Sequence, residues 1–81
     1  MPAAEQFEVR SEQAWKKLLG RKVSIRFALR GNPTHPFSEA IGVVLSVEQD
    51  DQGSARARIL TRTGAVVPVR VEDVLAGKVW L

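Results

Sequence analysis

Hydrophobic and polar residues alternate along most of this chain, and this alternation predicts β-strands. Side chains of a strand point to opposite faces in turn, so a period of two indicates one buried and one solvated face. The first such strand begins at Lys22 and is expected to bury Val23, Ile25, Phe27 and Leu29. The segment GNPTHP (31–36) ends it, because proline lacks the amide hydrogen that a strand ladder needs.

Four further segments complete a predicted set of five strands: EAIGVVLSVE (39–48), ARARILTRT (55–63), AVVPVRV (65–71) and GKVWL (77–81). Gly42 marks the expected place of a sharp bend or bulge. Pro68 has the opposite parity to its valine neighbours, which suits an edge strand. The side chains expected to face the interior are Ile41, Val43, Leu45, Val47, Ala57, Ile59, Val67, Val69 and Val71.

A helical period occurs only near the N-terminus, in SEQAWKKLLG. It predicts a helix over residues 11–19, with Ser11 as its N-terminal cap and Gly20 in the left-handed position that ends it. Trp15 and Leu18 lie on its apolar stripe, and we expect them to plug one open end of the fold.

The order of these elements is typical of one fold class. Five short strands, a long first loop, tight later hairpins and a helical turn at EDVL (72–75) predict a mainly β, five-stranded SH3-like small barrel with a short N-terminal α-helix. At 81 residues the chain has room for one domain, which we place at residues 11–81 with the helix included. Residues 1–10 lack turn chemistry and periodicity, and are predicted to be a flexible arm.

Four segments resemble a known family: LGRKVSIRF, IGVVLSV, RTGAVVPV and EDVLAGK. They are similar to the SH3-like domain at the N-terminus of certain actinobacterial GNAT-family acetyltransferases, over roughly residues 19–78. The shorter opening LLGRKV is also similar to Sm-like barrels and to the C-terminal barrels of biotin ligases. Because the chain has no glycine-rich loop for acetyl-CoA, the resemblance implies a stand-alone module without a reaction of its own.

Composition and charge narrow the function. The chain has no cysteine, which fits a reducing cytoplasm, and no apolar run long enough to span a membrane. Its formal net charge is +3, but residues 16–70 alone carry ten Lys and Arg against four acids, or +6. A basic middle of this kind permits attraction to polyanions.

The basic residues expected on the outward faces of the first and third strands are Lys22, Arg26, Arg30, Arg56, Arg58 and Arg62. Alternate strand positions lie about 6.5–7 Å apart, close to the phosphate spacing of a nucleic-acid strand. However, small barrels that bind single strands stack bases on exposed aromatics, and aromatic residues are few here. We therefore interpret this face as solvated, edge-protecting charge, with nucleic-acid binding as the second hypothesis.

The first hypothesis is a non-enzymatic module that binds another protein, or itself. Its candidate surface is the loop with Pro33, His35, Pro36 and Phe37, since aromatics beside prolines and arginines are typical of protein interfaces. Trp80 and Leu81 either extend this exposed apolar surface or fold back over the barrel beside Trp15. No membrane partner and no small-molecule substrate is expected.

An enzyme is not expected, and no cofactor or metal is. His35 is the only histidine and is interpreted as a solvent-exposed loop residue, because no second ligand or base stands at a telling spacing. Asp50 and Asp51 lack the alternating oxygen ligands of a calcium loop and occupy a hairpin turn, where aspartate is favoured.

Overall fold

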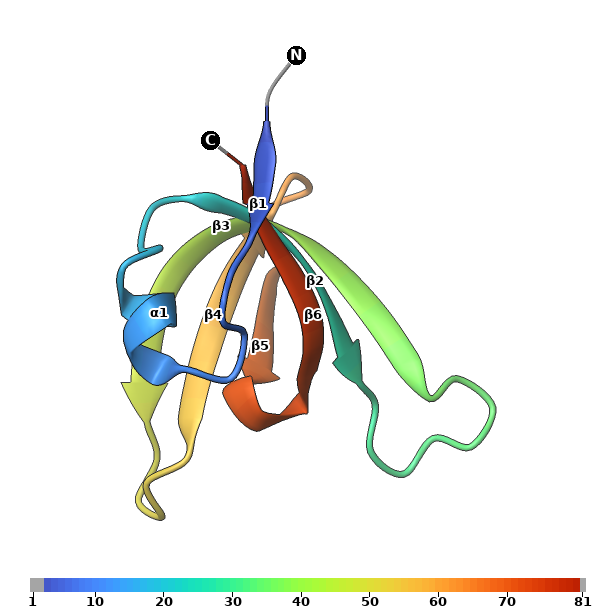
Figure 1. The fold of residues 1–81 in the computed structure, drawn as a ribbon. Helices are drawn as coiled ribbons and strands as arrows, with labels where there is room; N and C mark the ends of the chain where they lie inside the picture. Colours follow the sequence, from blue (N-terminus) through green and yellow to red (C-terminus); the bar gives the residue numbers. More distant parts are fainter. Residues whose placement is uncertain (1–2, 81) are drawn as a thin grey trace.

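The computed structural model describes residues 3–80 and consists mainly of β-strands (Figure 1). The predicted short helix and the helical turn before the last strand are both present. The elements in chain order are β1 (Ala4–Gln6), α1 (Glu12–Lys16), β2 (Lys22–Ala28), β3 (Phe37–Gln49), β4 (Ala55–Thr61), β5 (Val66–Arg70), the 3-10 turn η1 (Val71–Asp73) and β6 (Val74–Trp80).

All six strands belong to one antiparallel sheet, in the order β1-β6-β2-β3-β4-β5. The prediction of five strands is therefore wrong. Closure into a barrel is not confirmed either, because in residues 3–80 strand β5 pairs only with β4 and β6 pairs only with β1 and β2. Figure 1 shows the sheet curling around its interior with η1 bridging β5 and β6, so the gap between these strands is spanned by a turn rather than by a ladder.

The additional strand, β1, lies in the segment for which we predicted a flexible arm. It pairs with the end of β6, with Ala4 opposite Trp80 and Gln6 opposite Lys78. All its side chains are exposed, so hydrophobic patterning carries no signal of it. The strand forms because the edge of β6 offers backbone donors and acceptors that would otherwise be unpaired. The domain boundary at residue 11 stays a prediction.

Strand β3 serves two parts of the sheet. Its first half, Phe37–Val43, pairs with β2, and its second half, Gly42–Gln49, pairs with β4. The two pairings overlap at Gly42 and Val43, and Gly42 is the position at which we expected the bend. A Cβ atom there would collide with the backbone carbonyl of Leu60, so only glycine lets β4 approach this closely.

The predicted inward set on β3 is wrong at Ile41, Val43 and Leu45 and right at Val47. Ala40 and Val44 are buried, whereas Ile41 and Leu45 are 50% and 46% exposed and Val43 is half-buried. The inward parity is thus that of Gly42, which must face the close approach of β4. The register shifts between Val44 and Ser46, and this bulge brings Val47 back onto the core as expected.

The inward residues predicted on the other strands agree with the structure except Leu29, which lies beyond the end of β2, is half-buried and does not belong to the core. The core contains Val23, Ile25, Ala57, Ile59, Val69 and Val71, while Phe27 and Val67 pack against it half-buried. Pro68 is exposed on β5, at an edge of the sheet as predicted.

Trp15 and Leu18 are buried and cover one end of the core, as predicted. Helix α1 is shorter than the expected range 11–19, because the chain leaves the helix after Lys16 in a tight turn. Ser11 caps the helix, and its Oγ accepts a hydrogen bond from the Ala14 amide. Gly20 has a φ of +79°, so the expected left-handed glycine is present, but it turns the chain into β2 rather than capping the helix.

Candidate interaction surfaces

The loop between β2 and β3 projects from the body of the molecule (Figure 1) and is organised by its own hydrogen bonds. At its base, the Leu29 amide donates to the Pro36 carbonyl at 2.8 Å. At its tip, the Asn32 side-chain oxygen accepts from the amides of Thr34 and His35 at 3.2 and 3.0 Å. With two prolines fixing φ as well, the loop has a defined backbone before any partner arrives.

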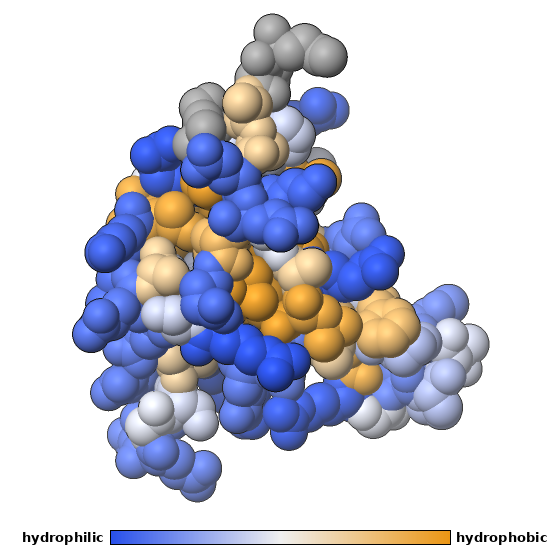
Figure 2. Space-filling model, in the orientation of Figure 1, coloured by the Kyte–Doolittle hydropathy of each residue, from blue (hydrophilic) through white to orange (hydrophobic). Residues whose placement is uncertain are grey.

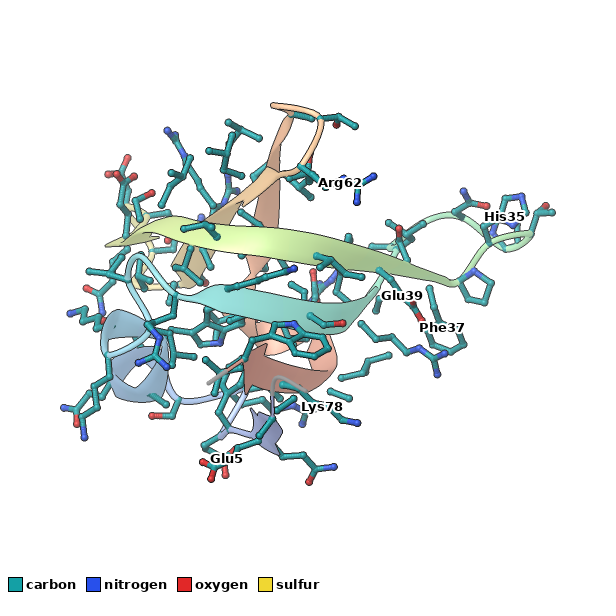
Figure 3. The ribbon with its side chains drawn as sticks, turned by 90° about the horizontal axis from the view of Figure 1, so that it is seen from above. Glu5, His35, Phe37, Glu39, Arg62 and Lys78 are labelled. Atoms are coloured by element: carbon teal, nitrogen blue, oxygen red, sulfur yellow. The ribbon has the colours of Figure 1, made fainter. Side chains whose placement is uncertain are left out.

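This loop presents every residue of the candidate protein-binding set to solvent. Pro33, His35 and Pro36 are exposed, and Phe37, at the first position of β3, is 55% exposed. Figure 3 shows His35 and Phe37 at the same end of the molecule. Figure 2 shows hydrophobic side chains reaching the surface over β6 and beside the start of β3, so an apolar area lies close to the loop.

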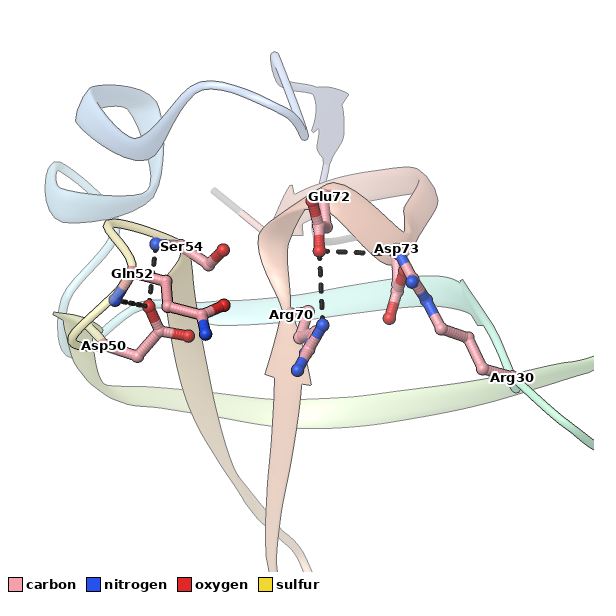
Figure 4. A network of polar contacts seen from close by, with 7 residues as sticks. All are labelled: Arg30, Asp50, Gln52, Ser54, Arg70, Glu72 and Asp73. Atoms are coloured by element: carbon pink, nitrogen blue, oxygen red, sulfur yellow. Dashed lines mark hydrogen bonds and ion pairs between the residues drawn. The ribbon is translucent and has the colours of Figure 1, made fainter.

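Ion pairs anchor the β2 side of the loop to η1 (Figure 4). The Arg30 guanidinium lies 2.7 Å from Asp73 and 3.4 Å from Glu72, and Glu72 also pairs with Arg70 at 3.4 Å. The hydrogen bond and the charge of Asp73 raise the pKa of Arg30 above its ordinary value. Arg30 is thus engaged by neighbouring carboxylates rather than presented alone to a polyanion.

Arg30 lies in the loop beyond the end of β2 rather than on the strand as predicted, and the two cations of β2 itself are engaged as well. Arg26 pairs across the strands with Glu39 at 3.3 Å. The Lys22 ammonium lies over the indole ring of Trp80, 5.7 Å from its centre, in a cation–π contact. The expected basic face of this strand is therefore largely balanced by groups of the same chain.

The arginines of the β4 hairpin differ from those of β2. Arg56, Arg58 and Arg62 are exposed, and within residues 3–80 none lies in an ion pair. The register places Glu48 opposite Arg56 without an ion pair between them. Because β3, with its exposed Ile41 and Leu45, separates β4 from β2, the six predicted cations do not form one continuous basic surface.

The carboxylates predicted to be structural take part in turn and helix contacts. Asp50 accepts the amides of Gln52 and Ser54, each at 2.9 Å, and these backbone hydrogen bonds lower its pKa (Figure 4). Hydrogen bonds from Gln49 and then Lys16 lower the pKa of Glu12. Within residues 3–80, no three histidine, cysteine or acidic side chains converge as a metal site would require.

Sequence reasoning missed a groove on the outer face of the sheet. It has a volume of about 620 Å³, and its lining includes Lys22, Ile41, Val43, Leu60, Arg62 and Trp80. It was missed because Ile41 and Val43 were assigned to the interior. The one signal that could have revealed it is Gly42, since a glycine that must face inward places both neighbouring side chains outside.

Comparison with known proteins identifies a family whose model matches most of the chain. A family model described as the Rv0428c N-terminal Sm-like domain matches residues 17–78, from the end of α1 into β6. The match agrees with the likeness of LLGRKV to Sm-like barrels. No curated protein matches the chain, and no solved structure does. No helix within residues 3–80 has the length and apolar character to cross a membrane.

Proposed function

Since the chain belongs to the family of Rv0428c N-terminal Sm-like domains, we propose that it is a non-enzymatic binding module whose partner is a protein. Small β domains of the Sm-like kind often mediate protein or RNA interactions. The observation that carries the choice of a protein is Phe37, a large aromatic side chain that stands more than half exposed at the base of a projecting loop.

Two physical arguments support this surface. Aromatic side chains are enriched at the cores of protein interfaces, and they dominate binding energy when a partner removes them from water. The loop beside Phe37 is also ordered by Asn32 and by its prolines, so little conformational entropy is lost when a partner binds. The partner is another protein or a second copy of this chain.

The proposal includes no reaction, metal or cofactor. Asp50 and His35 were the candidates for metal binding or catalysis. Asp50 closes a hairpin turn, and His35 lies exposed on the loop. The finer resemblance, to domains at the N-terminus of actinobacterial GNAT-family acetyltransferases, is part of the proposal and implies a module that works beside enzymes. So is a cytoplasmic location, expected for a chain without cysteine.

The test compares two variants of β3. Phe37→Ala removes the proposed anchor, and Leu45→Ala is the matched control, because Leu45 has similar exposure on the same strand, eight positions from Phe37. We expect a protein of the native lysate to be retained by wild type and Leu45→Ala, and to bind Phe37→Ala about tenfold more weakly when purified. Sedimentation equilibrium tests the self-association form with the same variants. Equal retention and equal association by all three proteins would contradict the proposal.

A second candidate, nucleic-acid binding, is favoured by the three arginines of the β4 hairpin that lie outside ion pairs: Arg56, Arg58 and Arg62. Titration with labelled RNA and DNA at two salt concentrations separates the candidates. Binding that weakens steeply with salt and disappears when the three arginines become serine would favour nucleic acid. Under the leading proposal we expect no such binding at low salt.

A further inference from the structure

The groove on the outer face of the sheet has an aliphatic floor built by cross-strand neighbours. Val43 of β3 stands opposite Leu60 of β4, and both line the groove. Ile41 extends this floor along β3 and is half exposed. Because neighbouring strands hold these side chains in register, the apolar area is fixed by the sheet and does not need to form when a ligand binds.

Cations stand at the rim of this floor. Lys22 and Arg62 line the groove from β2 and from the turn after β4, while none of the described lining residues is acidic. Arg62 is exposed and belongs to no ion pair within residues 3–80. The rim therefore complements a carboxylate, and the floor complements a large apolar side chain.

We propose that this groove binds a short segment of a partner protein in which a large apolar side chain stands beside a carboxylate. A volume of about 620 Å³ is ample for one or two large side chains and lies in the usual range of ligand sites. Figure 3 shows Arg62 and Phe37 at separate parts of the molecule. The site is thus additional to the proposed function and does not depend on it.

Two other occupants fit the chemistry less well. Single-stranded nucleic acid stacks its bases on aromatic faces, but this floor is aliphatic, and the ring of its tryptophan, Trp80, is already contacted by Lys22. A strand added at the β5 edge of the sheet would meet Pro68, which supplies no amide hydrogen. The geometry points to docking by side chains on the face of the sheet.

The test begins with selection of a random dodecapeptide phage library on the wild-type protein. We expect enriched peptides to place an aspartate or glutamate within two positions of a large apolar residue. They should bind Ile41→Asp at least about tenfold more weakly, and bind Leu45→Asp as the wild type does, because Leu45 has similar exposure on the same strand but lies outside the groove. No enrichment above the Ile41→Asp background, or enrichment of basic peptides, would overturn the proposal.

The two tryptophans then report the position of the strongest synthetic peptide by NMR. The indole N–H signal of Trp80 should shift when the peptide binds. The signal of Trp15 should not, because this indole is buried and donates a hydrogen bond to the Val9 carbonyl. Arg62→Gln should weaken binding, whereas Arg56→Gln should not. Phe37→Ala should leave binding unchanged, so failure of the groove and failure of the loop surface are distinguishable. Equal effects of the two arginine variants, or competition by a uridine oligonucleotide, would contradict the assignment.

Discussion

Trp15 fixes the N-terminal segment onto the sheet through several contacts at once. Its side chain is fully buried, and its indole Nε1 donates a hydrogen bond of 2.7 Å to the Val9 carbonyl. The ring of Phe7 meets it edge-on, with 5.1 Å between centres. A helix of five residues would not persist alone in water. The contacts of Trp15 therefore hold both α1 and the segment from Phe7 to Val9 against the sheet.

Removing this side chain should therefore cost a large part of the stability. We expect Trp15→Ala to lower the free energy of unfolding by about 3–5 kcal/mol, because it leaves a cavity under α1. Trp15→Phe should cost about 1–3 kcal/mol, since the Val9 carbonyl loses its donor. Leu19→Ala, at a half-exposed position of the following turn, is the control and should stay within about 0.5 kcal/mol. Urea denaturation measures the free energy of unfolding of all three variants. Equal losses would contradict the conclusion that Trp15 holds this end of the core closed.

Asp50 makes the hairpin between β3 and β4 sensitive to acid. Its pKa is lowered in the folded state by the amides of Ser54 and Gln52, so folding favours the ionised form. The stabilisation is fully present above the unfolded pKa of about 3.9 and is lost as the pH falls through the lower folded pKa. An NMR titration should give Asp50 a pKa below the ordinary aspartate value of about 3.9. The Ser54 amide should exchange faster with solvent once Asp50 is protonated, and an unchanged rate would count against this account.

At the scale of elements, β3 controls the form of the sheet. One strand of 13 residues pairs with β2 and β4 in turn, and it does so at Gly42, where a side chain would meet the backbone of Leu60. Gly77 of β6 is also crowded, but there a side chain would meet the rings and methyl groups of Phe7 and Val9. Backbone cannot yield without moving a strand, whereas side chains can turn aside.

This difference predicts unequal effects of the same substitution. Gly42→Ala should lower the free energy of unfolding by about 3 kcal/mol, at the upper end of the usual cost of overpacking. Gly77→Ala should cost less by at least about 1 kcal/mol, because its neighbours can adopt other rotamers. Thermal unfolding of both variants checks the prediction. A Gly42→Ala protein as stable as Gly77→Ala would show that β3 does not need the close approach.

The success of sequence patterning differed between elements for physical reasons. On β2 the large apolar residues Val23, Ile25 and Phe27 take the inward positions, so the period of two is read correctly up to the end of the strand. On β3 apolar residues occupy both parities around Gly42, and the choice between them depends on the path of β4, which is a tertiary fact. Strand β1 has no apolar period and forms through backbone pairing with β6 alone. The loop with Phe37 was predictable because its prolines are local signals. The groove was not predicted, because the wrong parity on β3 assigned two of its lining residues to the interior.

At the scale of the whole molecule, the open sheet protects both of its edges. Strand β1 covers the end of β6, and Pro68 interrupts the other edge at β5. Because the Thr61 amide bonds to the Ala65 carbonyl, residues 66, 68 and 70 direct their backbone groups away from β4. Pro68 therefore removes the central donor of that edge, which leaves side-chain surfaces for recognition.

Restoring a backbone amide at position 68 should promote self-association. We expect Pro68→Val to self-associate more strongly with concentration than the wild type, because an intact edge strand can pair with another copy. Val66→Thr, which changes an exposed side chain of the same strand and leaves Pro68 in place, is the control. Sedimentation velocity over a concentration series measures the difference. The same association state for Pro68→Val and Val66→Thr would show that the edge is protected in another way.

The most direct test of the central claim, recognition of a protein at the exposed aromatic of the loop, is site-specific photo-cross-linking in cells. A photoreactive phenylalanine analogue replaces Phe37 in one protein and Leu45 in another, and each cross-linked product is treated separately with protease and with nuclease. The account predicts a product at position 37 that protease removes and nuclease does not, with little product at position 45. A product removed by nuclease, or equal products at both positions, would contradict it.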